Sequence, residues 1–289
     1  MNTKKLSLGD IIVYIAVSLI SLICIAPFIY IISVSLTDPS VYKPFKLYFI
    51  PEKMSFISYT YILSNDNFLR AVKNTLFITV VGTALNVIFT FTMAYALTKK
   101  EMPHRNLFMG IVIFALLFNA GIVPNYLLVK QLGLINSPWA LILPVLTNSW
   151  SLIVAKSFID SLPAELEESA KMDGCTEIGA FFRIIVPLSM ASITTLTLFF
   201  AVGHWNTYFN ALIYLTDSKK MTLQVYVKTL LVDSSTNGAG TTGMVDLLNI
   251  PTETVRMATV VLAMLPIMAV YPFVQRFFIK GAMLGSIKG

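Results

Sequence analysis

A charged segment set between two long apolar ones is the feature that most limits what this chain can fold into. Residues 163–187 hold five of the fifteen acidic residues, and the segments before and after them are apolar over membrane-crossing lengths. An unpaired charge inside lipid is costly. Residues 163–187 are therefore predicted to lie in water, as a loop between two membrane spans that can contact another molecule.

The composition places the chain in a membrane. Of its 289 residues, 56% are hydrophobic and 12% are charged, and the mean hydropathy is +0.76. Soluble domains typically carry about 25% charged residues. The apolar run after Lys4 and Lys5 is too long for the hydrophobic part of a cleavable signal peptide and long enough to span a bilayer. The sequence predicts an integral, multi-pass protein of the cell membrane.

Six apolar segments come near the roughly 20 residues that a helix needs to cross a bilayer. The predicted spans are residues 11–36, 74–98, 107–129, 139–158, 186–212 and 257–279. They predict an all-α fold with one transmembrane domain over residues 1–289. An even number of spans puts both termini on the same side as loop 160–185, with loops 37–73 and 213–256 on the other side. Lys and Arg are nearly balanced between the two sides, so they do not settle the orientation.

The loop of residues 160–185, here called the charged loop, is predicted to form two short helices joined by a bend. Pro163 suits the first position of a helix, and the glutamates that follow suit the positive end of its dipole. Asp173-Gly174 is a turn signal, because glycine adopts the left-handed conformation that ends a helix and aspartate can cap the next one.

The charged loop also resembles a family signature. The matching residues are Glu168, Ser169, Ala170, Asp173, Gly174, Phe181, Ile184 and Pro187. At this spacing they resemble the cytoplasmic loop of the permease subunits of binding-protein-dependent ABC importers. The family pattern usually begins Glu-Ala-Ala, and Ser169 replaces one small residue by another.

The resemblance extends over nearly the whole chain and points to the carbohydrate branch of that family. Its segments are residues 118–126, 139–144, 203–214 and 256–289. One departure is Ala120-Gly121, where the branch usually has two glycines after a phenylalanine. The resemblance implies six transmembrane helices of the ABC importer permease type, with the charged loop in the cytoplasm as the coupling helix that contacts an ATPase.

The resemblance also implies the function and the partners. It identifies the chain as the permease subunit of an ATP-driven importer that translocates an oligosaccharide or sugar derivative. The implied partners are a homologous second permease subunit, two cytoplasmic ATPase subunits that bind the ATP and Mg, and an extracellular solute-binding protein that delivers the sugar. A permease for a non-sugar solute such as an amino acid or peptide is the alternative.

The sequence contains no pattern typical of an enzyme. Cys24 and Cys175 are far apart, so neither a disulfide framework nor a metal site of paired cysteines is supported. His104 and His204 are expected on opposite sides of the membrane. Without a Gly-Lys dipeptide there is no phosphate-binding P-loop. The net charge of +6 is expected beside the membrane and is no argument for nucleic acid binding.

The middles of the predicted spans hold uncharged polar residues and lack Asp, Glu, Lys and Arg, in contrast to most secondary transporters. Seven residues are candidates for the substrate pathway: Asn86, Asn119, Trp205, Asn206, Tyr208, Phe209 and Asn210. Aromatic faces beside amides suit a sugar site. An aromatic belt at the membrane interface explains residues 205–210 equally well, and polar groups in spans can simply join helices.

Overall fold

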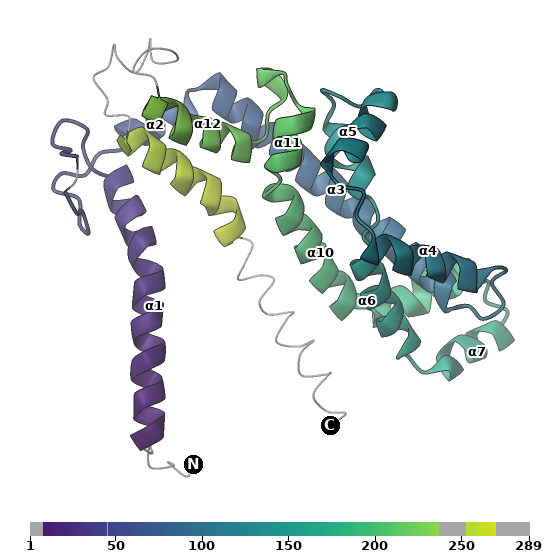
Figure 1. Ribbon diagram of the computed structural model, residues 1–289. Helices are drawn as coiled ribbons and strands as arrows, with labels where there is room; N and C mark the ends of the chain where they lie inside the picture. The colour runs from purple at the N-terminus through teal and green to yellow at the C-terminus, as the bar shows by residue number, and fades with distance from the viewer. Residues whose placement is uncertain (1–7, 45, 237–252, 270–289) are drawn as a thin grey trace. The chain divides into compact units, whose positions relative to one another are not determined.

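The computed structural model describes residues 8–44, 46–236 and 253–269, and these residues form helices with no strand among them. The chain divides into two compact units. Unit 1 comprises Met1–Leu69 and Val227–Leu265, and unit 2 comprises Arg70–Tyr226 and Pro266–Gly289. The helices are labelled in Figure 1. Two features of the sequence lie outside the described residues: the Gly-rich segment after residue 236 and the C-terminal part of the family resemblance.

Unit 1 contains α1 (Leu8–Ser35), α2 (Ile57–Leu63) and most of a helix at residues 253–269. The hydroxyl of Ser58 donates to that of Thr254 at 3.1 Å, which joins α2 to the later helix. The side chains of α1 are mostly exposed along the helix, and they are apolar on all sides. A helix that is apolar all round suits a lipid environment.

The segment between α1 and α2 is held by an ion pair. Lys53 Nζ lies 2.6 Å from Asp38 Oδ2, and Ser40 donates to Asp38 Oδ1 from its backbone N–H at 2.9 Å and its hydroxyl at 2.7 Å. The hydrogen bonds from Lys53 and Ser40 lower the pKa of Asp38 to about 2. This part of predicted loop 37–73 is therefore an ordered polar structure.

Unit 2 is built on the long helix α3 (Asp66–Thr98), most of which belongs to it. The elements that follow in the chain are α4 (Arg105–Leu117), α5 (Ile122–Gln131), the 3-10 turns η1 (Pro138–Leu141) and η2 (Leu143–Val145), and α6 (Ser149–Asp160). After them come α7 (Ala164–Met172), α8 (Glu177–Ala180), the π-helical turn η3 (Phe181–Ile185), α9 (Val186–Leu188), α10 (Met190–Trp205), α11 (Phe209–Tyr214) and η4 (Ser218–Lys220). The helix α12 (Leu223–Thr236) begins in unit 2, and its part from Val227 onward belongs to unit 1.

Two helices in the described part of the chain are long and apolar enough to cross a membrane, or up to four if each of two bent helix pairs counts as one span. α1 overlaps predicted span 11–36, and α3 contains predicted span 74–98 and begins earlier, at Asp66. The helix at 253–269 covers the first part of predicted span 257–279, and the rest of that span lies outside the described residues.

The other three predicted spans are broken. Residues 107–129 divide into α4 and α5 around Gly121, whose φ of +85° is left-handed. The segments at 138–160 and 177–205 bend by 49° and 79° at their breaks. Pro138 and Pro144 lack the backbone N–H that a continuous helix requires, so they favour the short turns before α6. Apolar length alone does not report where such breaks lie.

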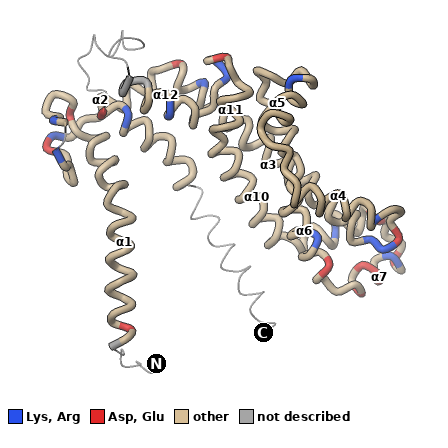
Figure 2. Tube along the Cα trace, viewed as in Figure 1, with Lys and Arg blue, Asp and Glu red and all other residues tan. Residues whose placement is uncertain are grey.

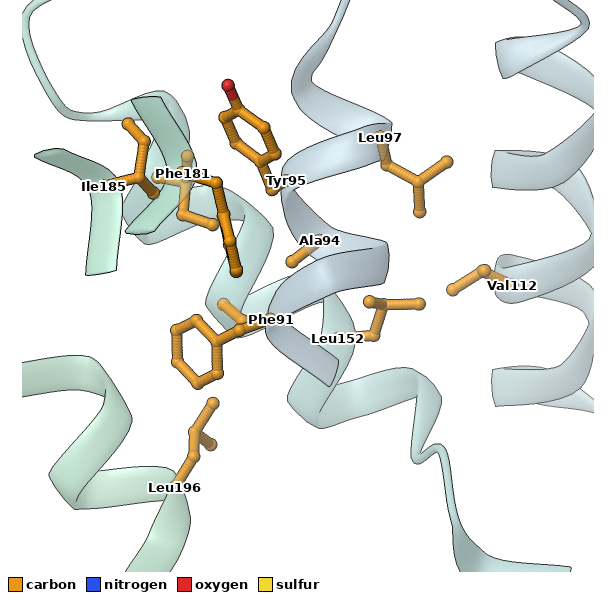
Figure 3. Packing of buried hydrophobic residues seen from close by; sticks show 11 residues of the cluster. Phe91, Ala94, Tyr95, Leu97, Val112, Leu152, Phe181, Ile185 and Leu196 are labelled. Carbon is orange, nitrogen blue, oxygen red and sulfur yellow. The ribbon is translucent and has the colours of Figure 1, made fainter. Parts of the chain in front are cut away.

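The core of unit 2 joins α3 to the charged loop (Figure 3). Its buried residues are Phe91, Ala94, Tyr95, Leu97, Val112, Leu152, Ala155, Ile159, Phe181, Ile185 and Leu196. They come from α3, α4, α6, η3 and α10. Between membrane helices, close packing supplies association energy that the hydrophobic effect does not. The second half of the charged loop is thus packed into the helix bundle.

Candidate functional site

The charged loop has the predicted shape. α7 ends at Met172, and Gly174 follows with φ +77°, so the predicted left-handed bend is confirmed. The backbone N–H of Cys175 donates to Ala170 O at 2.9 Å, which closes the end of α7. Thr176 then caps α8 by accepting a hydrogen bond from the N–H of Gly179 at 3.2 Å. Two short helices joined by a sharp bend are the result.

A cluster of charges holds the charged loop against the end of α3. Lys99 Nζ pairs with Glu167 and lies 2.9 Å from Glu177 Oε2. Lys171 Nζ lies 2.7 Å from Glu177 Oε1 and 3.3 Å from Glu167 Oε1. The Tyr95 hydroxyl donates to Glu177 Oε2 at 2.9 Å. These five residues are here called the loop network, and Figure 2 shows the concentration of charge around α7.

The ion pairs of the loop network shift the pKa values of Glu177 and Lys171. Glu177 and Lys171 lie in the loop, outside the predicted spans. Hydrogen bonds from Lys171 and Lys99 lower the pKa of Glu177 to about 2, and the bond to Glu177 raises the pKa of Lys171. An isolated surface pair contributes little, but here the Lys99 and Glu167 side chains are only 19% and 21% exposed. The loop network therefore fixes both short helices to one end of α3.

Sequence reasoning did not assign the loop network. The i,i+4 spacing of Glu167 and Lys171 is a local signal of an ion pair. Tyr95 and Lys99 lie 72 and 68 positions away from Glu167, so only the fold brings them together.

The predicted residues of the charged loop divide by exposure. Glu168, Ser169, Asp173, Gly174 and Pro187 are exposed, Ala170 and Ile184 are half-buried, and Phe181 is buried. The Phe181 ring lies 5.1 Å from that of Tyr95, between centroids, so Phe181 belongs to the core of unit 2.

Four large apolar side chains on the loop are exposed and were not predicted as site residues: Met172 at 89%, Ile178 at 72%, Phe182 at 63% and Leu166 at 44%. Exposed apolar side chains on a charged loop favour contact with a protein partner.

Three predicted pathway residues meet at a cavity of about 280 Å³. The lining comprises Asn119, Gly121, Ile122, Asn125, Phe209, Asn210, Ile213 and Tyr214, and we call the site the asparagine pocket. Asn119, Phe209 and Asn210 were predicted, whereas Asn125 and Tyr214 were missed. Asn125 lies four residues after Gly121, and the apolar context of α5 gave no reason to single it out.

The walls of the asparagine pocket are fixed by a loop contact. Asn136 has a left-handed φ of 59°, and its N–H donates to Tyr214 O at 2.8 Å. Its side-chain oxygen accepts hydrogen bonds from the N–H groups of Thr216 and Asp217 at 2.7 and 3.0 Å. The Tyr214 ring stacks on that of Tyr126 at 6.4 Å. Asn136 thereby anchors the end of α11, which carries half of the lining.

The other predicted pathway residues lie away from the asparagine pocket. Trp205 is buried at 5% exposure, and its indole N–H has no hydrogen-bond partner among the described residues. Asn206 is exposed and Tyr208 is half-buried, and neither lines the pocket. Asn86 is 1% exposed, and its side chain is hydrogen-bonded to Val145, Leu146 and His204. In this conformation Asn86 and Trp205 are packing residues.

No group of three potential metal ligands occurs among the described residues. Cys24 and Cys175 are both free thiols.

Comparison with known proteins identifies a matching family and several similar proteins. Residues 78–283 match the family described as "Binding-protein-dependent transport system inner membrane component". The chain is 45% identical over 291 residues to Protein LplC of Bacillus subtilis (strain 168), covering 100% of this chain and 97% of LplC. It is 41% identical over 285 residues to the polygalacturonan/rhamnogalacturonan transport system permease protein YtcP of the same strain, covering 99% and 100%.

A solved structure is also similar over nearly the whole chain. The crystal structure of a bacterial ABC transporter involved in the import of the acidic polysaccharide alginate contains a chain with 31% identity and a TM-score of 0.89, covering 96% of this chain and 100% of that one.

Proposed function

Because the chain belongs to the family of binding-protein-dependent transport system inner membrane components, we propose that it is the permease subunit of an ATP-driven importer of an oligosaccharide or sugar derivative. The observation that carries this proposal is similarity over essentially the full length to YtcP and to the alginate transporter chain, both described as carriers of polysaccharide. The family is a transporter component and not an enzyme, which agrees with the absence of a catalytic motif.

The asparagine pocket supports a sugar as the solute. Amide groups of Asn119, Asn125 and Asn210 can hydrogen-bond hydroxyls, and the rings of Phe209 and Tyr214 supply apolar faces on which a sugar ring can stack. The lining residues carry no charge. An amino acid or peptide would bring an ammonium, which needs a negatively charged or strongly polar partner when it leaves water. The pocket chemistry therefore favours the sugar over this alternative.

The charged loop is proposed to be the coupling helix. Its exposed residues Glu168, Ser169 and Asp173, together with Met172 and Phe182, would contact a cytoplasmic ATPase subunit. The loop network would pass the movement of the ATPase to α3. This proposal places both termini in the cytoplasm and includes six spans, with ATP and Mg bound by two ATPase subunits. A second permease subunit and an extracellular binding protein complete the importer.

The function is tested with the complex of this chain, its partner permease, the ATPase and the binding protein in proteoliposomes. We expect oligosaccharides to stimulate ATP hydrolysis and to accumulate inside, and amino acids and short peptides to do neither. Stimulation and uptake with an amino acid or peptide alone would overturn the sugar assignment.

Two matched pairs of variants test the sites. Asn210→Ala removes an amide from the asparagine pocket, whereas Asn206→Ala removes one just outside it. Loss of a single hydrogen bond corresponds to an approximately fivefold decrease in uptake, and only Asn210→Ala should show this decrease.

The second pair tests the charged loop. Glu168→Lys should release the ATPase on purification, because reversing a charge at an interface lowers affinity several-fold or more. Glu165→Lys, also exposed, is its control. Equal behaviour within either pair contradicts that assignment.

A further inference from the structure

Asn86 joins three segments of unit 2 that are far apart in the chain. Its amide nitrogen donates to Val145 O at 2.7 Å and to Leu146 O at 2.9 Å. Its Oδ1 lies 2.6 Å from His204 Nε2. Asn86 belongs to α3, His204 lies in the last turn of α10, and Val145 and Leu146 lie at the break before α6.

The hydrogen bonds fix the orientation of both side chains. The two N–H groups of the Asn86 amide are used by two carbonyls, so its oxygen must face His204. An oxygen can only accept, and His204 therefore carries its hydrogen on Nε2 and donates it. The carbonyls at a helix break inside a membrane have no water to bind and need an internal donor. Asn86 supplies that donor.

Gly82 shows how closely α10 approaches α3 here. A Cβ atom at Gly82 would lie 2.6 Å from His204 Nε2 and 2.7 Å from Cε1, so any larger residue would displace the imidazole ring. Gly82 lies about one turn before Asn86 on α3. Gly82 leaves room for the imidazole ring of His204 against α3, and Asn86 accepts its hydrogen bond.

The position of this contact along the chain suggests its role. α6 runs from the break to the start of the charged loop, and α10 runs from the other side of the loop back to His204. Phe209 and Asn210 of the asparagine pocket follow shortly after His204. Asn86 therefore ties the backbone directly before α6 to His204 at the end of α10 that leads into the pocket. The contact of Trp150 with Phe199, with ring centroids 5.9 Å apart, lies between the same two helices.

We propose that Asn86 and His204 are positioning residues that make α6 and α10 move as one body, so that movement of the charged loop reaches the asparagine pocket. The inference rests on the proposed function. The bonds of Asn86 hold the carbonyls of Val145 and Leu146, directly before α6, and so fix the point about which α6 could swing. Removal of the His204 donor would leave helices intact but separate loop movement from pocket movement.

The variants exploit what each side chain can donate. His204→Phe keeps a ring of similar size and removes the donor. His204→Gln keeps a terminal N–H near the position of Nε2. Asn148→Ala is the matched control, because Asn148 caps α6 at the same break, by accepting from Ser151 N at 3.0 Å, without a bond to α10.

The first measurement is oligosaccharide uptake per ATP hydrolysed by the complete importer in proteoliposomes. Loss of one hydrogen bond predicts a fall of about fivefold for His204→Phe, recovery to within about twofold of wild type for His204→Gln, and no change for Asn148→Ala. The inference is wrong if His204→Phe lowers thermal stability or yield while uptake per ATP stays at the wild-type value. It is also wrong if Asn148→Ala lowers uptake per ATP as much as His204→Phe does. In either case Asn86 and His204 only stabilise the fold.

The second measurement does not need the substrate, so it separates the two proposals. Spin labels at Ser161 on the loop side of α6 and at Val202 on α10, in a Cys24→Ser, Cys175→Ser background, report the distance between these helices in the complex. The distance distribution should be narrow in wild type and in His204→Gln and broad in His204→Phe. Equal widths in all three would overturn the inference. Failure of every oligosaccharide to be transported by wild type would overturn only the proposed function.

Discussion

The charged loop and the asparagine pocket are both polar parts of unit 2, yet they are built in different ways. The loop takes its shape from neighbours in sequence, namely the left-handed Gly174 and the Thr176 cap. The pocket takes its lining from α5, α11 and the break after α4. The loop also satisfies its charges by pairing them, whereas the pocket leaves amides facing a cavity. Local chemistry thus builds the surface proposed to meet a protein, and tertiary packing builds the site proposed to meet a sugar.

Asparagine shows the same contrast between single residues. The side chain of Asn86 is hydrogen-bonded to backbone carbonyls and to His204, while Asn119 and Asn210 line the cavity. Residue type and apolar surroundings are alike in the sequence. A buried amide that is fully hydrogen-bonded stabilises a fold, and one that faces a cavity can exchange water for a ligand.

The variant Trp205→Ala best distinguishes a residue that packs in the core from one that contacts the substrate. Trp205 is buried, so its truncation should leave a void and lower stability by about 3 kcal/mol. Uptake per folded complex should stay near wild type, because Trp205 does not line the asparagine pocket. Thermal unfolding in detergent and uptake normalised to folded complex measure the two effects. A stable variant with reduced uptake would place Trp205 in the pathway and contradict the distinction.

A charge reversal tests whether the loop network orients the charged loop. In Lys99→Glu a third carboxylate would face Glu167 and Glu177, and like charges brought together cost several kcal/mol at a contact. Substrate-stimulated ATP hydrolysis should fall about tenfold or more. Lys100→Glu is the control, since Lys100 has no ion pair among the described residues. Comparable losses in both variants would mean that net charge, and not the network, is responsible.

The bend of the charged loop is tested at Gly174. Its φ of +77° is unfavourable for a β-branched residue, and Gly174→Val should cost about 1–2 kcal/mol locally. We expect uptake and stimulated ATP hydrolysis to fall together while assembly in the membrane survives. Gly174→Asn should be milder, because asparagine adopts the left-handed conformation more readily. Normal uptake by Gly174→Val would show that transport does not need the bend.

The smallest expected effect is a dependence on pH confined to the loop. The pKa of Glu177 is about 2 in the folded loop, against an ordinary value of 4.5. A lowered pKa means that Glu177 stabilises the loop fully above about pH 4.5 and that this contribution is lost as the pH falls towards 2. Hydrogen-exchange protection of residues 164–180, measured relative to the intrinsic exchange rate at each pH, should fall over this range. In Glu177→Gln that loss of protection should be smaller, and an unchanged profile would exclude Glu177 as its cause.

Much of the charged loop could be predicted because its signals act over a few residues. A glycine after a short helix and glutamates in its first turn each act on the nearest backbone groups. The cap of the second helix was expected at Asp173, but Thr176 provides it, and Asp173 lies at the end of α7. The membrane class followed from composition in the same direct way. The positions of the breaks in the apolar segments were not predicted, because hydropathy reports transfer into lipid and not helical continuity.

The sequence by itself determined that this chain enters a membrane, that its charged loop bends at Gly174, and that it belongs to a transport family. Only the tertiary structure decided that Lys99 anchors the loop, that Asn119 and Asn210 share a cavity, and that Asn86 is bound to His204. Backbone propensities act between near neighbours, but these contacts join residues as far as 118 positions apart. Their partners are chosen by how the helices break and pack, which no local pattern encodes.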